Sequence, residues 1–435
     1  MNVHLPFDKQ SISIRLPETT TVLHTTYPEV SESAEHLAQD AMQHPISSPG
    51  FVDVLKQRRP GQVVIVVSDI TRPLPYSAFL PQVLQEIENA GVPRDELLIL
   101  IATGMHRPST PAERVEILGQ EICARYHVQD HNPDADLVEL PTKSWSGNSV
   151  WLNRDFVNAG FRFIAGLVEP HYMAGFSGGR KAVCPGLASL DTVRRFHGYE
   201  FLANPNTDAG QLDDNPCHLE ALSVASAVGV DFSLNVVLNH SRQIIKAFAG
   251  QLEDAHLHAC QYVQQHAVPA VEHEFDVVLT SSAGYPLDAT FYQCTKSLVT
   301  ALPAVKSDGH IVSIGGCCEG IGSQEYENIL LNYSDSSDLF IKDISKTETV
   351  IKDQWQHQMH VRALIKLGRE NLMFITNAIK SDVLNKLSVN GMSTSDVQQT
   401  AQSLIDRAVA DGKSICVIPE GPYCTPRAIK KGVCV

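Results

Sequence analysis

The feature that most constrains the fold is a repeated pattern, in which a short apolar run stops at a polar loop and a helix-length segment follows. Three such runs lie at residues 63–67, 97–102 and 161–168. Continuous apolar runs of this length are typical of strands covered on both faces, and strands that alternate with helices form parallel sheets. Because open α/β sheets bind ligands at the carboxyl ends of their strands, we expect the three polar loops to build a site.

The same pattern starts again after residue 270, with strand-like runs at 276–280, 310–314 and 371–376. A chain of 435 residues is also too long for one ordinary core. We therefore predict an α/β protein of two Rossmann-like domains with mostly parallel sheets, covering residues 1–268 and 269–404. We expect these domains to meet across an active-site cleft.

Both ends of the chain have strand patterns of their own. Residues 2–23 alternate apolar and polar positions around Asp8, Lys9 and Gln10, which predicts a hairpin. A last strand is expected at residues 414–418, and it would return the C-terminal segment, about residues 405–435, to the first domain.

The charge and cysteine content narrow the class of protein. A net charge of −15 without charge runs argues against nucleic acid or anionic membranes as partners, and a small anionic substrate would need local cations. The ten cysteines form no CxxC pair, and the chain starts without an apolar signal region. No apolar run approaches the ~20 residues that cross a bilayer. We therefore expect a cytoplasmic protein with reduced thiols.

The loop after the third apolar run has an unusual composition. Residues 174–181, Ala-Gly-Phe-Ser-Gly-Gly-Arg-Lys, contain three glycines and two cations, which is typical of a loop that binds an anion such as a phosphate. The triphosphatase signature places Ser or Thr after its lysine. Here Ala182 follows Lys181, so we reject a nucleotide triphosphatase and keep the bound anion.

Four motifs together carry a family resemblance. They are residues 68–73 (Ser-Asp-Ile-Thr-Arg-Pro), residues 102–108 (Ala-Thr-Gly-Met-His-Arg-Pro), the stretch 169–200, and residues 284–288 (Gly-Tyr-Pro-Leu-Asp) with Tyr292, Gln293 and Lys296 behind them. In this order they resemble the nickel-pincer-nucleotide lactate racemase family. Four motifs in one order are far more specific than a single glycine loop.

The resemblance implies a racemase or epimerase that inverts C2 of a small anionic 2-hydroxy acid by reversible hydride transfer. In similar enzymes the cofactor is a nickel-pincer nucleotide, a pyridinium-3-thioamide-5-thiocarboxylic acid mononucleotide. It is joined through a thioamide to the lysine that corresponds to Lys181, and separate maturation enzymes make it. The same resemblance implies that His197 binds the nickel, and one imidazole suffices because the nucleotide supplies the other ligands.

The resemblance also implies roles for the remaining motif residues. His106 and His171 would alternate as general base and general acid, a role that suits side chains titrating near neutral pH. Asp69, Thr71, Ser177, Gly178 and Gly179 would contact the cofactor, as would Arg72. Substrate contacts would come from Arg72, which with Lys296 could hold the carboxylate, and from Tyr292, Gln293 and Trp355.

The residues by themselves leave other interpretations open. Lys181 could be a phosphate-binding lysine at a helix N-terminus, His197 a capping histidine, Lys296 a surface lysine and Trp355 a core residue. A non-catalytic protein that binds a phosphorylated ligand is one rival function. A cofactor-free racemase that removes the C2 proton directly is another.

Overall fold

The computed structural model describes residues 1–428 except 60, 73, 335 and 348. Pro73 of the 68–73 motif and residues 429–435 of the C-terminal segment therefore lie outside the described residues. The chain divides into two compact units. Unit 1 contains residues 1–26, 197–205 and 264–435, and unit 2 contains residues 27–196 and 206–263.

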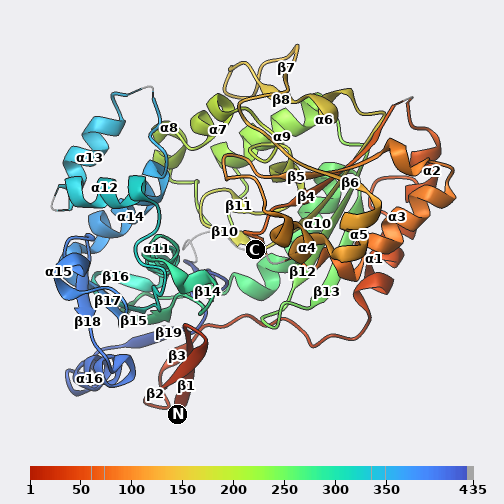
Figure 1. Ribbon diagram of the computed structural model, residues 1–435. Helices are drawn as coiled ribbons and strands as arrows, with labels where there is room; N and C mark the ends of the chain where they lie inside the picture. Colours follow the sequence, from red (N-terminus) through yellow and green to blue (C-terminus); the bar gives the residue numbers. More distant parts are fainter. Residues whose placement is uncertain (60, 73, 335, 348, 429–435) are drawn as a thin grey trace. The chain divides into compact units, whose positions relative to one another are not determined.

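Unit 2 is built on a six-stranded sheet in the order β13-β12-β9-β4-β5-β6 (Figure 1). All neighbouring strands are parallel except β13, which pairs antiparallel with β12. The strands are β4 (Val63–Ser68), β5 (Leu97–Ala102), β6 (His127–Asp130), β9 (Phe161–Leu167), β12 (Phe232–Leu238) and β13 (Ile244–Gly250). The three apolar runs of the sequence are therefore the central strands β4, β5 and β9, as predicted.

The helices of unit 2 connect these strands and cover the sheet. One face packs against α1, α2 and α3 through alternate side chains such as Val63, Ile65 and Val67, all fully buried. The helices are α1 (Ala34–Gln43), α2 (Phe51–Lys56), α3 (Leu80–Asn89), α4 (Pro111–Leu118), α5 (Gln120–Arg125), α6 (Arg154–Asn158), α7 (Leu190–Phe196), α9 (Pro216–Val228) and α10 (Leu252–Ala267).

Unit 1 contains a second six-stranded sheet, in the order β18-β17-β16-β15-β19-β3. Every neighbouring pair in it is parallel. The strands are β3 (Thr21–Val22), β15 (Phe275–Ser281), β16 (Val305–Ile314), β17 (Leu372–Thr376), β18 (Asn390–Ser393) and β19 (Ile415–Ile418). The helices are α8 (Tyr199–Ala203), α11 (Phe291–Thr300), α12 (Gln324–Tyr333), α13 (Ser337–Ile344), α14 (Gln354–Leu367), α15 (Ser381–Leu384) and α16 (Val397–Ala410).

The N-terminal residues and the described part of the C-terminal segment belong to unit 1, which differs from the predicted domain boundaries. The predicted N-terminal hairpin is present as β1 (Asn2–Phe7) and β2 (Gln10–Arg15). Its apolar side chains pack in one core cluster with β15, β19 and α16. The predicted last strand, β19, pairs with β15 on one side and β3 on the other, so the C-terminal segment, as far as the structure describes it, does not return to the sheet of unit 2. Long-range parallel pairing decides this placement, and local sequence patterns do not report it.

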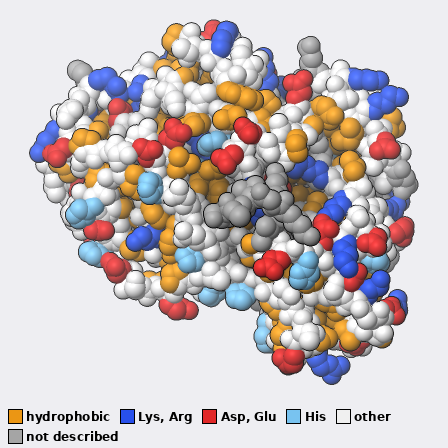
Figure 2. All heavy atoms as spheres, turned by 180° about the vertical axis from the view of Figure 1, so that it is seen from behind, with side chains coloured by type: hydrophobic (Ala, Val, Ile, Leu, Met, Phe, Trp, Pro, Cys, Tyr) orange, Lys and Arg blue, Asp and Glu red, His pale blue; other side chains and the backbone are white. Residues whose placement is uncertain are grey.

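Two properties of the whole chain complete the description. Within the described residues, none of the helices combines the length and apolar character needed to span a membrane. On the face drawn in Figure 2, acidic and basic side chains are interspersed, so the net charge of −15 is not gathered into one patch there.

Candidate functional site

The loop after β4 and the loop after β5 lie side by side because the two strands pair in parallel, with Ser68 opposite Ala102. This pairing brings Asp69 to His106, whose Nδ1 lies 2.6 Å from Asp69 Oδ2. Thr71 donates to the other carboxylate oxygen, Oδ1, through its backbone N–H at 3.2 Å and its hydroxyl at 2.6 Å. The prediction that these strand ends deliver polar side chains to one edge of the sheet is therefore confirmed.

The Asp69 carboxylate stays ionised in this setting. Burial alone would raise its pKa, but the hydrogen bond and charge of His106, the hydroxyl of Thr71 and the charge of Arg72 together lower the pKa below the usual value. Asp69 is only 6% exposed, whereas the His106 side chain is 55% exposed. A buried carboxylate thus holds an accessible imidazole by one ring nitrogen.

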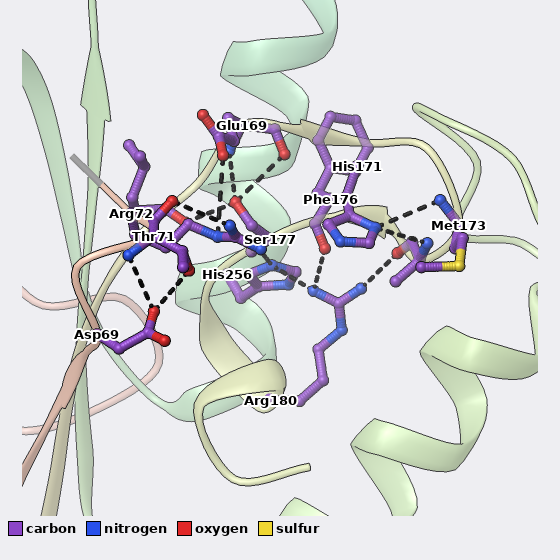
Figure 3. Close-up of polar contacts among 12 residues, drawn as sticks. Asp69, Thr71, Arg72, Glu169, His171, Met173, Phe176, Ser177, Arg180 and His256 are labelled. Atoms are coloured by element: carbon purple, nitrogen blue, oxygen red, sulfur yellow. Dashed lines mark hydrogen bonds and ion pairs between the residues drawn. The ribbon is translucent and has the colours of Figure 1, made fainter. Parts of the chain in front are cut away.

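Arg72 connects the same edge to the end of β9. Its Nε lies 4.0 Å from Glu169 Oε1, and its Nη1 donates to the backbone oxygen of Thr71 (Figure 3). A separation of 4.0 Å is at the outer limit of an ion pair, and such half-exposed pairs contribute little to stability. Sequence reasoning had not assigned a role to Glu169, although its place directly behind a buried strand was a usable signal.

His171 sits on a two-residue hairpin formed by β10 (Pro170–His171) and β11 (Gly175–Phe176). Its Nδ1 accepts hydrogen bonds from the backbone N–H groups of Met173 at 3.3 Å and Ala174 at 3.2 Å (Figure 3). The tight turn requires glycine at 175, where φ is +74° and a Cβ would lie 2.3 Å from the Gln211 backbone oxygen.

Arg180 holds this hairpin from inside the unit. Its guanidinium donates to the backbone oxygens of Ala174 at 2.7 Å and Phe176 at 2.9 Å, and to Nε2 of His256 at 2.8 Å. Burial lowers the pKa of Arg180 to about 10, so the group remains a cation at neutral pH. Burial and the Arg180 charge lower the pKa of His256 well below its usual value, so this imidazole is neutral. Its Nε2 also lies 2.9 Å from the Ser177 backbone oxygen, and it accepts from Arg180 in the tautomer that places the lone pair on Nε2. The sequence did not indicate this contact.

The glycine loop is shaped by packing within unit 2. A Cβ on Gly178 would lie 2.7 Å from Val168, and one on Gly179 would lie 2.6 Å from His256. The backbone N–H of Gly179 donates to the Asn235 side chain, and the Ser177 hydroxyl donates to the Leu167 backbone oxygen. These groups are engaged within the protein, so their predicted contact with a cofactor phosphate stays a prediction.

Lys181 follows Arg180 in a short helical turn, Gly179–Ala182, and is half-buried. Within the described residues Arg180 bonds to backbone oxygens and to His256, and no carboxylate pairs with it. Burial, together with the Arg180 charge, lowers the pKa of nearby His218 to about 3. The surroundings of Lys181 thus contain a buried cation without a paired carboxylate and favour an anionic ligand.

A second group of predicted site residues lies in unit 1. On α11, Lys296 follows Tyr292 by four residues and Gln293 by three, so its side chain lies on the same side of the helix as each of them. The indole N–H of Trp355, on α14, donates to the Tyr292 hydroxyl at 3.0 Å. The ring of His197 lies 4.8 Å from that of Trp355. Trp355 therefore contacts two predicted site residues, and Lys296 is half-buried.

Helix α14 also fixes the segment that follows His197. Gln358 donates to the Tyr199 backbone oxygen at 3.0 Å, and Arg362 donates to those of Leu202 and Asn204 at 2.7 and 2.9 Å. The predicted nickel ligand therefore belongs to unit 1, although the sequence analysis placed it in the first domain with Lys181. The backbone that follows His197 is bound by side chains 159 and 160 residues further along the chain.

The motif at residues 284–288 organises unit 1. Oδ2 of Asp288 accepts the backbone N–H groups of Asp8 and Gly316, each at 2.8 Å. The backbone N–H of Tyr285 donates to the oxygen of Asp8 at 2.7 Å. The motif thus ties the turn of the N-terminal hairpin to the glycine-rich turn that begins at Gly315. Its visible role is structural.

Comparison with known proteins gives a consistent result along the chain. Residues 7–210 match the model of the lactate racemase N-terminal domain, and residues 270–423 match that of the lactate racemase C-terminal domain. A lactate racemase from Thermoanaerobacterium thermosaccharolyticum is 31% identical over 97% of this chain and 98% of that protein. One from Lactiplantibacillus plantarum is 28% identical over 96% and 98%.

A solved structure agrees with the fold as well. The lactate racemase apoprotein from Thermoanaerobacterium thermosaccharolyticum superposes with a TM-score of 0.88 at 29% identity, and the match covers 99% of this chain and 100% of that one. The α/β fold class predicted from the strand pattern is confirmed.

Proposed function

Because the chain belongs to the lactate racemase family and is an isomerase of the racemase class, we propose that it inverts C2 of a small 2-hydroxy acid. The observation that carries this proposal is the pair of histidines on the loops that follow β5 and β9 of unit 2. His106 is held by a buried carboxylate, and His171 by the N–H groups of a tight hairpin. Inversion needs such groups on both sides of the reacting carbon.

The residues around Lys181 fit an attached anionic cofactor, which we propose to be a nickel-pincer nucleotide. The fit rests on the uncompensated Arg180 cation beside a half-buried lysine amine. Within the described residues no three His, Cys, Asp or Glu side chains are grouped to hold a metal by themselves. One imidazole, which we propose to be that of His197, therefore suits a metal that takes its other ligands from the bound group. When bound, that group supplies the acceptor for the C2 hydrogen.

The chain's own residues would handle the hydroxyl proton and the carboxylate. His106 would take the proton at Nε2, and the ionised Asp69 would stabilise the resulting imidazolium. Asp69 and Thr71 bond to each other, so we propose that both position His106, in addition to their predicted contact with the cofactor. Arg72 and Lys296 are the proposed cations for the substrate carboxylate, with Tyr292, Gln293 and Trp355 as further substrate contacts.

Racemisation of chiral 2-hydroxy acids tests the proposed function. Protein coexpressed with cofactor-maturation enzymes should invert at least one acid in a panel that includes lactate, and His106→Gln or His171→Gln should abolish this activity. A protein that binds members of the panel but inverts none would favour the rival binding function.

The fate of the C2 hydrogen separates the proposal from direct proton removal. An imidazole is poorly matched to the very weakly acidic C2–H, because general-base catalysis typically contributes only ~10²–10⁴-fold. Substrate deuterated at C2 should therefore keep its label during racemisation in ordinary water. Loss of the label to solvent at the rate of racemisation would favour the cofactor-free mechanism.

A further inference from the structure

The two histidines of unit 2 differ in what faces their Nδ1 atoms. At His106 the neighbour is Oδ2 of Asp69, 2.6 Å away. The other oxygen of that carboxylate already accepts the N–H and hydroxyl of Thr71, and its lowered pKa keeps the carboxylate ionised. An ionised carboxylate can only accept hydrogen bonds. Nδ1 of His106 must therefore carry the hydrogen, and in the neutral ring Nε2 has a lone pair.

At His171 the arrangement is reversed. Its Nδ1 faces the backbone N–H groups of Met173 and Ala174, at 3.3 and 3.2 Å. A backbone N–H can only donate, so Nδ1 must hold the lone pair and Nε2 carries the hydrogen in the neutral ring. This assignment follows from the chemistry of the partners and not from hydrogens placed on the ring.

The fold maintains the His171 arrangement through Arg180. The buried guanidinium binds the backbone oxygens of Ala174 and Phe176, which lie within the turn that supplies the two N–H groups. A hydrogen on Nδ1 of His171 would point at the hydrogens of those two N–H groups and repel them. Relieving this repulsion would require the turn that Arg180 holds to change its conformation. The buried position of Arg180, 1% exposed, opposes such opening.

We propose that the protein holds His106 and His171 in opposite tautomers, so that His106 presents a lone pair at Nε2 while His171 presents an N–H. The catalytic meaning of this inequality rests on the proposed function. In the resting protein, only His106 could accept a substrate hydroxyl proton at Nε2, where the O–H bond breaks and a new N–H bond forms. His171 would donate a hydrogen bond to an oxygen at its side, and it could act as a base at Nε2 only by changing tautomer, with the ring hydrogen moving from Nε2 to Nδ1.

Nuclear magnetic resonance of the protein without cofactor tests the tautomers directly. Protein labelled with nitrogen-15 in histidine would be studied at about pH 9, where an ordinary imidazole is neutral. Two-bond couplings from ring nitrogens to carbon-bound ring hydrogens distinguish the tautomers, and His106→Gln and His171→Gln assign the signals. We expect the Nδ1–H pattern for His106 and the Nε2–H pattern for His171. The same tautomer in both rings, or an averaged mixture in either, would overturn the proposal.

Asp69→Asn supplies a second, directional test. Thr71 requires an acceptor at the Oδ1 position, so the new amide must turn its NH₂ group toward Nδ1 of His106. His106 should then switch to the Nε2–H pattern, while His171 keeps its own. Thr71→Val, which leaves the carboxylate in place, should leave both patterns unchanged. An unchanged His106 pattern in folded Asp69→Asn protein would contradict the assignment to Asp69.

These readouts can fail separately from the proposed function, because they need neither cofactor nor turnover. Opposite tautomers in a protein that inverts no 2-hydroxy acid would contradict the function and leave the inference standing. The same tautomer in both rings of an active racemase would contradict the inference and leave the proposed function standing.

Discussion

At the scale of single residues, Arg180 shows how a buried charge can serve positioning. Its guanidinium satisfies two backbone oxygens and one neutral imidazole at once, which the single ammonium of lysine on a flexible stem cannot reproduce. Since a hydrogen bond to a charged group contributes ~1.5–3 kcal/mol, Arg180→Lys should lower the free energy of unfolding by about 2–4 kcal/mol. Urea unfolding would measure this change.

Arg59→Lys is the matched control, since Arg59 is 55% exposed and pairs with Asp231 on the surface. Its cost should stay within about 1 kcal/mol. If both substitutions lowered the free energy of unfolding equally, the buried hydrogen bonds of Arg180 would contribute no more to stability than a surface ion pair.

His197 gives a second prediction at this scale, which rests on the proposed function. If its imidazole is the protein's nickel ligand, His197→Ala should lose most of the bound nickel in protein matured with its cofactor. His106→Gln should keep the metal and lose turnover, because the ring of His106 is bound to Asp69 and its proposed role is to take up the substrate proton. Metal analysis beside intact-protein mass spectrometry would check both, with Lys181→Ala as the variant that loses the cofactor adduct. Full nickel in His197→Ala would exclude the assignment.

At the scale of elements, Asp288 joins the N-terminal hairpin to the turn after β16. Removing its side chain would leave the buried N–H groups of Asp8 and Gly316 without their acceptor, and each loss costs ~1–3 kcal/mol. Asp288→Ala should therefore lower the free energy of unfolding by about 2–4 kcal/mol, measured by urea unfolding. Asp288→Asn is the matched control, because one amide oxygen can accept both bonds. An equally large loss in Asp288→Asn would show that the charge matters more than the two bonds.

At the scale of the whole molecule, several histidines are held neutral in the interior. Burial lowers the pKa of His360 to about 4, and burial with the charge of His360 lowers that of His357 well below the usual value. In the unfolded chain these histidines take up a proton near pH 6.5. Their contribution to the free energy of unfolding is therefore fully present above that pH and is lost as the pH drops toward 4. For His360 alone the loss is about 3 kcal/mol.

Urea unfolding across this pH range would show the effect. His360→Leu should make the loss of stability shallower, because neither ring nitrogen of His360 has a hydrogen-bond partner in the described part of the chain and none is therefore forfeited. His36→Gln, at a 62% exposed position, is the surface control for this substitution. A His360→Leu profile identical to that of the parent protein would mean that His360 does not titrate between the two states.

Local pattern was sufficient for the elements and for the strand-end side chains. The apolar runs became β4, β5 and β9, and the parallel pairing of β4 with β5 brings Asp69 to His106. The local pattern could not predict the partners of Arg180, because a cation within a glycine loop has the same local sequence whether it binds an anion or backbone oxygens. Its 1% exposure arises from the packing of β9 and α10 around the loop.

The sequence by itself determined the α/β class, the strand positions, the family and the motif residues, because these depend on side-chain periodicity and on residue identity. Tertiary structure alone decided that β3 and β19 complete the second sheet and that His197 lies with Trp355 in unit 1. It also decided which ring nitrogen of each histidine meets a donor or an acceptor. These outcomes depend on contacts between residues far apart in the chain, whose energies no local stretch of sequence contains.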